Sequence, residues 1–555
     1  GAGDAAQPAA RKLRTISVVL PCASEKILMV NTVRSIYENT PADVLAEILV
    51  VDDGSETPLS TLWPADDADP SGVAGVPVGG FDPSPNAGHW GKIKQKVRFL
   101  RHEKIMGLMT ARTTGANAAM GDVVAMFDCH VKPDKNWWPS VLSEISENYR
   151  RVTIPVITRL DIDTWKEVGR RPAPGGGMSA CYFAWDSEFK WANNRFWKPG
   201  EKRWVPVMSG GLLAMSREWW VELGGYDKEM KGWGGENIEQ SLRIWLCGGE
   251  IVSLDDSYIA HMWRDSSHPK TLKHYNVIGS TLRNRWRAVS AWLGDFKAKT
   301  LTFPDFRGFR FPTPAEDLQA YAPTKARLQC KTFEWYVDRF ANIFHKSGLM
   351  PETVFQLESQ RAPGVCLERT GSVLGHAKVA HGPLSLAPCN KDERLQFFHK
   401  ANQAADGECC SGLRGYDSDQ CVRHNGQFGG GSESIDTAVC SIDGSNLAQI
   451  ATLGGDGRIV LGGHHDRCLQ IVPASTASVP PAEGEAKAQA WDLAAVPCDR
   501  AAENSVPKPK VLPKWNRLEE RVSLEREIYD RMKFSMSSGH GEVKKVNGTE
   551  EVGPR

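Results

Sequence analysis

The sequence predicts an α/β domain built on a parallel sheet, followed by a small all-β module. In the N-terminal part, short apolar strands alternate with helices, a pattern typical of a parallel sheet covered on both faces. Between residues 361 and 500 no helical periodicity remains, and the chain is rich in glycine, cysteine and short strand-like runs. Because 555 residues exceed one typical hydrophobic core, two or more domains are expected.

Residues 15–60 contain the first three elements, a strand, a helix and a second strand. The helix places Leu28, Thr32 and Ile36 at helical spacing and stops at Pro41, whereas the second strand is an apolar run that ends in two carboxylates. The later elements are expected, in order, as a strand at 96–102, a helix near 108–119, a strand at 122–128, a mixed segment at 204–227, a helix at 236–249 that stops at Gly-Gly, and a helix-rich stretch near 315–345.

The composition of the connecting segments suggests where the domains begin and end. Residues 61–91 are rich in Pro, Gly and Asp and predict a mobile loop inserted in the first domain. Residues 516–534 carry apolar side chains on one helical face, so a helix is expected in the charged C-terminal tail. The predicted segments are an N-terminal tail at 1–14, the α/β domain at 15–345, a linker at 346–360, the all-β domain at 361–500 and the C-terminal tail at 501–555.

Composition also narrows the function class. Lys+Arg and Asp+Glu both total 67, so the bulk charge indicates neither a nucleic-acid partner nor an anionic membrane. No apolar run approaches the roughly 20 residues of a membrane-spanning helix, and we expect no membrane anchor in this chain. The cysteines cluster towards Cys366–Cys498, which favours disulfides and an oxidising compartment over the alternative of buried free thiols.

Carboxylates follow two strands of the predicted parallel sheet: Asp52 and Asp53 follow one, and Asp128 follows another. Ligands of open α/β sheets bind at the carboxyl ends of the strands. One loop would hold a nucleotide, and the other a metal ion on its diphosphate. Asp128 and His130 are two apart and would face the same side, and carboxylate with imidazole suits manganese. Taken alone, this DxH pattern favours an ordinary solvated turn.

A long downstream stretch carries the strongest signal. Residues 231–269 read KGWGGENIEQSLRIWLCGGEIVSLDDSYIAHMWRDSSHP, and they follow MSGGLLAMSREWWVELGGYD, GLMTAR and VVDDGS further upstream. In order and spacing these motifs resemble the polypeptide N-acetylgalactosaminyltransferases, and the resemblance extends over residues 15–340. It implies a GT-A fold of two abutting β/α/β units, Rossmann-like, and a retaining transfer from UDP-GalNAc to Ser or Thr. It also implies Mn²⁺ held by DxH and a distant third histidine.

The resemblance assigns roles to individual residues. The metal ligands would be Asp128, His130 and His261, and the acceptor contact would be Trp185. Donor contacts would be Asp52, Asp53, Arg112, Gly210, Gly211 and His268, and the catalytic set would be Trp233, Glu236, Asn237 and Arg264. Structural alternatives remain open: an ordinary strand-end histidine, core aromatics, a helix cap at Glu236 and Asn237, and a plain Gly-Gly turn.

Several positions depart from the family's pattern. Lys132 stands where a carboxylate is usual close to the metal, Ile105 where an arginine is usual, and Lys270 where an aromatic residue is usual. The loop that carries Lys270 is one residue longer, and the insert at 61–91 is also unusual. These changes indicate a divergent member, and they bear on efficiency more than on reaction type.

The resemblance further implies disulfides and a ricin-type β-trefoil lectin domain at 361–500. Cys247 and Cys330 match a family pair, whereas the other usual catalytic-domain bridge is expected to be absent because Asp256 replaces one cysteine. Where the family's sugar-binding Asp would stand, the three repeats carry Glu368, Arg423 and Gln470, so at most Glu368 is expected to form a weak sugar site. The trefoil pairs would be Cys366–Cys389, Cys421–Cys440 (with Cys410 competing for Cys421) and Cys468–Cys498.

The leading functional expectation is therefore a transferase that initiates or extends mucin-type O-glycosylation, with Ser/Thr proteins or glycopeptides as acceptors. The chain would be the luminal part of a type II membrane protein of the Golgi, with its anchor outside this sequence. Two alternatives stay open. One is a catalytically weak or silent glycopeptide-binding protein on the same scaffold, and the other is a transferase with another donor sugar or a preference for already glycosylated peptides.

Overall fold

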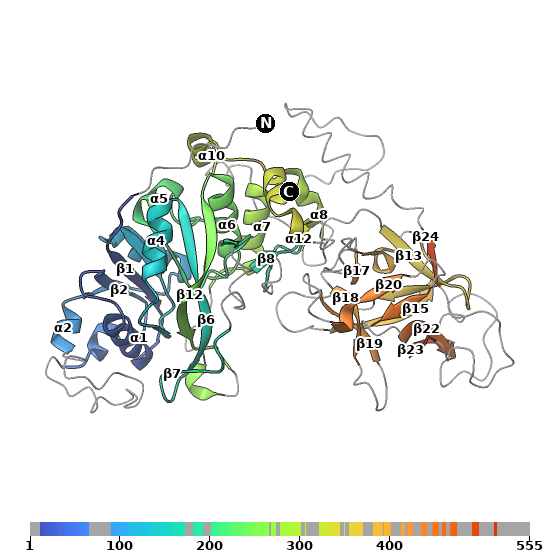
Figure 1. Cartoon of the computed structure of the whole chain (residues 1–555), viewed down its shortest axis with the longest axis horizontal. Helices are drawn as coiled ribbons and strands as arrows, with labels where there is room; N and C mark the ends of the chain where they lie inside the picture. Colours follow the sequence, from blue (N-terminus) through green and yellow to red (C-terminus); the bar gives the residue numbers. More distant parts are fainter. Residues whose placement is uncertain are drawn as a thin grey trace.

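The structure, a computed structural model, has an α/β body followed along the chain by an all-β body (Figure 1). It describes residues 11–65, 90–172, 181–191, 201–265, 268–272, 278–300, 303, 306, 321–344, 349, 354–369, 381–391, 393–400, 412–416, 420–425, 434–440, 447–453, 458–461, 467–473, 491–498 and 515–518. Most of the expected insert at 61–91 and nearly all of the C-terminal tail lie outside these ranges.

The α/β body is built on a ten-stranded sheet in the order β10-β12-β6-β11-β4-β1-β2-β3, with β5 paired to β12 and β7 to β6. Its strands are β1 (Ile16–Cys22), β2 (Leu45–Asp53), β3 (Val97–His102), β4 (Val123–Met126), β5 (Val131–Pro133), β6 (Arg151–Asp161), β7 (Lys166–Val168), β10 (Arg203–Trp204), β11 (Leu213–Ser216) and β12 (Glu250–His261). A separate hairpin is formed by β8 (Cys181–Phe183) and β9 (Phe189–Trp191).

The expectation of a parallel sheet is correct for β1, β2, β3 and β4, and wrong for the sheet as a whole. β11 runs antiparallel to both β4 and β6, and β10 runs antiparallel to β12. A parallel strand needs a long crossover connection, usually a helix, whereas an antiparallel strand does not. Between β6 and β11 the described residues form strands and no helix, so β11 returns in the opposite direction.

Helices cover both faces of this sheet. They are α1 (Ile27–Glu38), α2 (Trp90–Lys94), α3 (Leu108–Ala118), α4 (Pro139–Glu147), α5 (Arg217–Leu223), α6 (Glu236–Leu246), α7 (Thr281–Trp292), α8 (Lys297–Thr300), α10 (Ala322–Leu328), α11 (Phe333–Arg339) and α12 (Ala341–Phe344). Strand residues alternate between two buried clusters. Val19 and Met126 pack with α3 and α6 residues on one face, while Val18 and Ala125 pack with α1 and α4 residues on the other. The burial of both faces explains the continuous apolar runs in the sequence.

The second body is all-β, as the sequence predicts. One sheet has the order β14-β15-β19-β18-β17-β16-β13-β24, with an additional β13–β14 pairing, and a second has the order β20-β21-β22-β23. The strands are β13 (Val354–Ser359), β14 (Val365–Arg369), β15 (His381–Pro388), β16 (Phe398–Lys400), β17 (Leu413–Gly415), β18 (Gln420–Asn425), β19 (Ser434–Val439), β20 (Ala451–Leu453), β21 (Ile459–Leu461), β22 (Arg467–Pro473), β23 (Trp491–Pro497) and β24 (Trp515–Leu518).

The expected tail helix is wrong at its beginning. Trp515–Leu518 form the strand β24, which pairs antiparallel with β13. Pairing satisfies the backbone of this segment and the edge of β13, and this tertiary pairing overrides a weak helical pattern. The rest of the expected helix lies outside the described residues.

Disulfides join Cys247 to Cys330, Cys366 to Cys389, Cys421 to Cys440 and Cys468 to Cys498, while Cys410 lies outside the described residues. A further disulfide between Cys22 and Cys129 was not anticipated from the sequence. Cys181 is a buried free thiol. Within the described ranges, no helix has the length and apolar character needed to cross a bilayer.

Candidate active site

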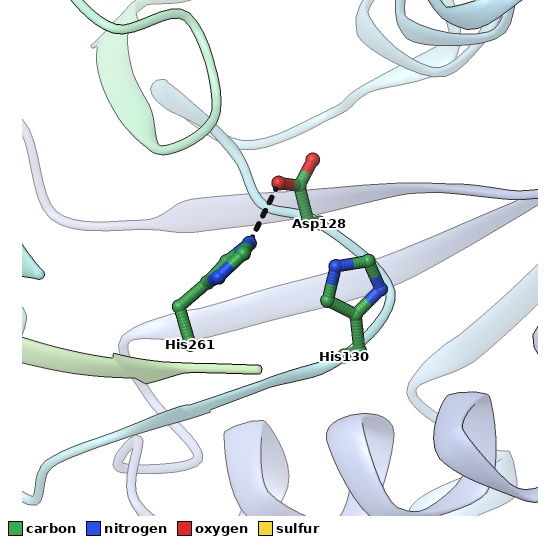
Figure 2. A group of neighbouring side chains, drawn as sticks. All are labelled: Asp128, His130 and His261. Carbon is green, nitrogen blue, oxygen red and sulfur yellow. Dashed lines mark hydrogen bonds and ion pairs between the residues drawn. The ribbon is translucent and has the colours of Figure 1, made fainter. Parts of the chain in front are cut away.

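One carboxylate and two imidazoles meet where β4 and β12 end (Figure 2). Asp128 follows β4, His130 precedes β5, and His261 is the last residue of β12. The antiparallel pairing of β5 with β12 sets His261 opposite Val131 and therefore beside His130. One ligand atom from each of Asp128, His130 and His261 lies within 4.8 Å of the others. Strand register thus brings together three residues that the sequence separates by 133 positions.

Electrostatics keep the Asp128 carboxylate ionised. Burial alone would raise its pKa, but the hydrogen bond with His261 Nε2 at 3.1 Å and the charge of Arg112 hold the pKa well below its usual range. Burial is the main cause that lowers the pKa of His261, and it outweighs the effect of Asp128. An anionic carboxylate beside a neutral imidazole is the protonation state that metal ligation requires.

These residues fit a divalent metal of intermediate softness. One carboxylate with two imidazoles suits manganese, iron or zinc better than calcium or magnesium. Nδ1 of His261 is buried and has no hydrogen-bond partner in the described part of the chain. A buried polar atom without a partner is costly unless something else binds it, so a metal or a ligand at this position would satisfy the site.

The cluster opens into a cavity of about 440 Å³, which is large enough for a nucleotide-sized ligand. Its lining includes residues from each of the motifs singled out in the α/β domain: Asp53, Ile105, Gly107, Arg112, Asp128, His130, Gly210, Gly211, Trp233, Glu236, His261 and Arg264. Ile105 therefore puts an apolar side chain on the wall where the family usually has arginine.

Arg112 organises the floor of this cavity. Its guanidinium is completely buried and donates to Asp128 Oδ1 at 3.1 Å, to the Gly211 carbonyl at 2.9 Å and to the Gly210 carbonyl. Gly210 has φ +86°, and a Cβ there would lie 2.9 Å from Cβ of Asn237. Gly210 is thus needed for a left-handed backbone and for close approach to Asn237, and the carbonyls of both glycines fix the arginine that holds Asp128.

The adjacent aspartates of VVDDGS have different surroundings. Asp53 lines the cavity and accepts hydrogen bonds from the backbone N–H groups of Met106 and Gly107 at 2.9 and 2.8 Å. Asp52 accepts from the backbone of Ser55 and Leu59, each at 3.0 Å, and is ion-paired with Arg101. The structure does not place Asp52 in the cavity wall, because successive side chains of β2 point to opposite sides. Asp52 therefore points away from the cavity and holds the turn that contains Ser55 and Leu59.

The WGGEN segment brings two of the expected catalytic residues to the cavity. Trp233 is 41% exposed at its mouth, and Glu236 begins α6 with its side chain buried. Burial raises the pKa of the Glu236 carboxyl. Asn237 lies in a small adjoining pocket and donates to the Met208 carbonyl at 3.2 Å.

Arg264 and His268 lie on the segment after β12 and point to different places. Arg264 lines the cavity and forms an ion pair with Glu25 at 2.7 Å. His268 is paired with Asp163 at 3.2 Å and is not among the cavity-lining residues. The described structure therefore brings Arg264 to the site and leaves His268 outside it.

The acceptor assignment needs a correction. Trp185 is 3% exposed, stacks on Phe296 and donates to the Leu349 carbonyl, so it belongs to the core. Besides Trp233, the exposed aromatic residues that line the cavity are Trp191 and Trp263, with ring centroids 6.4 Å apart. The period-two spacing of Trp263 from His261 was the available signal for one of them, because it puts both side chains on one side of the extended chain.

Lys132 does not sit at the metal cluster as the sequence suggested. Its ammonium donates to the Trp165 carbonyl at 3.0 Å, and the nearby charges are Glu38, Lys166, Glu167 and Arg34. The replaced carboxylate thus changes the charge of a neighbouring surface more than that of the metal site.

In the all-β body, Glu368 accepts a hydrogen bond from Gln396 at 2.9 Å, an amide that also reaches the Pro388 carbonyl. At the matching position of the second repeat, Arg423 forms an ion pair with Asp436 at 2.8 Å. The charge of Arg423 is therefore paired internally, whereas Glu368 is a carboxylate oriented by an amide.

Family models support this description of the α/β body. A model described as glycosyl transferase family 2 matches residues 88–220, and one described as the N-terminal domain of galactosyltransferase matches residues 193–269. Among solved structures, the crystal structure of GalNAc-T7 with UDP, GalNAc and Mn²⁺ has a TM-score of 0.52 at 23% identity and covers 87% of this chain and 82% of that one. At this identity the likeness shows the fold.

Curated relatives are more similar in sequence. Polypeptide N-acetylgalactosaminyltransferase 8 of Drosophila melanogaster is 32% identical over 69% of this chain and 60% of its own length. Inactive polypeptide N-acetylgalactosaminyltransferase-like protein 5 of Macaca fascicularis is also 32% identical, over 60% of this chain and 68% of its own length. The chain spans between half and two thirds of the length of the first curated relatives, at 60%, 65% and 50%.

Proposed function

The chain belongs to the polypeptide N-acetylgalactosaminyltransferase family, and we propose that it transfers N-acetylgalactosamine from UDP-GalNAc to Ser or Thr of proteins with Mn²⁺ as cofactor. The observation that carries the proposal is the convergence of Asp128, His130 and His261 on a cavity lined by the motifs that resemble those of the family. A nucleotide sugar and a metal on its diphosphate are the ligands that this combination of groups suits best.

In the proposed reaction, the bond between the anomeric carbon and the diphosphate oxygen breaks and a bond to the acceptor hydroxyl oxygen forms on the same face. The hydroxyl proton passes to the departing diphosphate and leaves with UDP. Because the acceptor attacks from the face that UDP leaves, the configuration of the anomeric carbon is retained. A bound divalent cation would supply Lewis-acid stabilisation of the diphosphate charge. Asp128, His130 and His261 would hold the cation, and Arg264 would add positive charge at the same end of the cavity.

Other residues would bind and orient the sugar and the acceptor. Glu236, buried in the cavity lining at the start of α6, would form a hydrogen bond with a sugar hydroxyl, and burial raises the pKa of its carboxyl. Trp233 would cover the donor from the cavity mouth, and Asp53 would bind the nucleoside. Trp191 and Trp263 offer exposed rings at the mouth for an acceptor peptide.

The all-β body is proposed to act as a lectin module with a single weak site at Glu368. The compartment is proposed to be the Golgi lumen, which the disulfides favour because they persist in an oxidising environment. A second candidate function, a silent glycopeptide-binding protein, is favoured by Ile105 in the cavity wall, where the family usually has an arginine.

The test is to measure UDP release and peptide modification with Mn²⁺, a panel of UDP-sugars, and matched bare and glycosylated Ser/Thr peptides. The proposal expects transfer with UDP-GalNAc and little with UDP-glucose or UDP-GlcNAc. A glycopeptide that binds without any transfer from any donor would contradict it and support the silent protein. Transfer limited to glycosylated peptides would identify a glycopeptide-preferring enzyme.

A further inference from the structure

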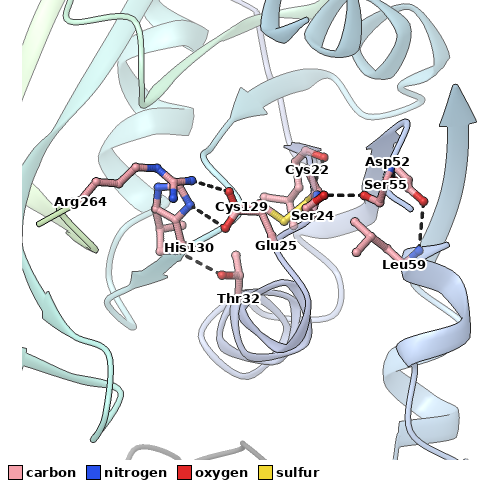
Figure 3. Close-up of a disulfide and its surroundings, with 12 residues drawn as sticks. Cys22, Ser24, Glu25, Thr32, Asp52, Ser55, Leu59, Cys129, His130 and Arg264 are labelled. Atoms are coloured by element: carbon pink, nitrogen blue, oxygen red, sulfur yellow. Dashed lines mark hydrogen bonds and ion pairs between the residues drawn. A yellow bond between two sulfur atoms is a disulfide. The ribbon is translucent and has the colours of Figure 1, made fainter. Parts of the chain in front are cut away.

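The disulfide between Cys22 and Cys129 lies beside the proposed metal site, next to the segment that carries His130 (Figure 3). Cys129 is the residue between Asp128 and His130, and Cys22 is the last residue of β1, the neighbour of β4 in the sheet. Both cysteines are buried at the cavity wall, with exposures of 0% and 1%. The bond therefore ties the segment carrying two predicted metal ligands to the end of the adjacent strand.

The segment after Cys22 also contacts the proposed metal site, through Glu25. Glu25 Oε2 lies 3.4 Å from Nδ1 of His130, and Glu25 Oε1 accepts from Arg264 Nη2 at 2.7 Å. One carboxylate thus faces a metal-site imidazole and holds the cavity arginine (Figure 3). A carboxylate beside the second ring nitrogen of a metal-binding histidine fixes the ring's tautomer and orientation.

The backbone around Glu25 is held in an unusual conformation. Ser24 has φ 55° and Lys26 has φ 49°, both in the left-handed region that non-glycine residues rarely adopt. The Cys22–Cys129 bond anchors one end of this segment, and Ser24 N–H donates to Ser55 Oγ at 2.9 Å. Such strain persists only where surrounding contacts determine it, and here those contacts direct Glu25 towards His130 and Arg264.

We propose that the Cys22–Cys129 disulfide and Glu25 form a positioning unit that sets Asp128 and His130 for Mn²⁺ binding, so that metal affinity depends on this cross-link. The proposal rests on the metal site of the proposed function. In this proposal the protein binds Mn²⁺ tightly when Cys22 and Cys129 are oxidised to the disulfide, and more weakly when the two thiols are reduced.

The chain offers a matched control for the bond. Cys247–Cys330 also lies in the α/β body, is not in the cavity wall, and closes a loop of 83 residues against 107 for Cys22–Cys129. Loops of similar length give similar entropic stabilisation, so removal of either bond should lower stability by a similar amount. For Glu25→Gln the control is Glu38→Gln, which loses an ion pair with Arg34 and lies outside the cavity wall.

The experiment is a titration of each purified protein with Mn²⁺, followed by the electron paramagnetic resonance signal of free Mn²⁺, with circular dichroism to establish folding. Removal of an outer partner of a metal ligand typically costs 10- to 100-fold in affinity. The Kd for Mn²⁺ should therefore rise at least about 10-fold in Cys22→Ala/Cys129→Ala and in Glu25→Gln. It should stay within about twofold in Cys247→Ala/Cys330→Ala and in Glu38→Gln.

Several outcomes of this titration overturn the proposal. A wild-type Kd in folded Cys22→Ala/Cys129→Ala refutes the role of the bond, and equal weakening in both double variants shows a general effect of stability. If the first double variant does not fold, Glu25→Gln retains the bond and decides alone, with an unchanged Kd refuting the unit. Wild-type protein that binds no Mn²⁺ contradicts the metal site itself, whereas Mn²⁺ binding without sugar transfer sinks the proposed activity and leaves this inference standing.

Discussion

Replacing Arg112 by lysine tests whether the planar guanidinium group, and not merely its positive charge, is needed to hold Asp128 and the Gly210–Gly211 backbone in place. The guanidinium donates to the carbonyls of Gly210 and Gly211 and to the carboxylate of Asp128. Lysine keeps the positive charge but cannot reach partners in this planar arrangement. At least two buried acceptors would lose their donor, and each costs about 1–3 kcal/mol. The expected loss of unfolding free energy is therefore roughly 2–6 kcal/mol.

Urea denaturation followed by tryptophan fluorescence would measure this loss, with Arg203→Lys as the matched control. Arg203 makes an ion pair at 3.3 Å with Asp255, whose side chain is exposed, and lysine can keep this single charged contact, so the control should lose at most about 1 kcal/mol. If Arg112→Lys unfolds at the same urea concentration as Arg203→Lys and the wild type, the buried network is not what fixes Asp128, and this part of the account is wrong.

Three further predictions concern stability and the second body. Asp227→Asn should destabilise the protein by about 1–3 kcal/mol at pH 7, because burial raises the pKa of Asp227 but hydrogen bonds from Arg287 and Tyr321 outweigh it and lower the pKa. Since the pKa of Asp227 is depressed in the folded protein, the stability difference between the wild type and Asp227→Asn should be present above about pH 4 and should shrink as the pH falls through the folded pKa. Thermal melts that show the same difference at every pH would refute this prediction. Cys247→Ala/Cys330→Ala should lower stability by about 4 kcal/mol in the loop-entropy model, and a melting temperature equal to that of the wild type would contradict the estimate. Glu368→Ala should reduce transfer to peptides that carry a distant N-acetylgalactosamine and leave bare peptides unchanged, so an equal effect on both, seen in paired kinetic assays, would argue against a lectin site.

Much of the site was predictable because motif residues at strand ends are directed by simple geometry. Asp128, His130 and His261 sit at the ends of β4, β5 and β12, where register determines their meeting. The period of two along a strand also explains why one of the adjacent aspartates reaches the cavity, although the sequence alone does not tell which of Asp52 and Asp53 it is.

The remaining features depend on contacts that no local pattern reports. Trp185 and Trp191 are similar in the sequence, yet one lies in the core and the other is 39% exposed at the cavity mouth. The antiparallel direction of β11 depends on how the chain between β6 and β11 returns, and the bond between Cys22 and Cys129 depends on the adjacency of β1 and β4. The strand β24 forms because its backbone can pair with β13, and this tertiary pairing overrides the local helical pattern.

The most direct test of the central claim measures transfer of labelled N-acetylgalactosamine from UDP-GalNAc to a Ser/Thr peptide by the wild type, Asp128→Ala and His261→Ala. Metal stabilisation of the diphosphate contributes several kcal/mol, so each substitution should lower kcat/KM by about 100-fold or more while circular dichroism stays unchanged. Excess chelator should do the same to the wild type, and added Mn²⁺ should restore it. Undiminished transfer by both variants, or by the wild type in chelator, would contradict a metal-dependent transferase built on Asp128, His130 and His261.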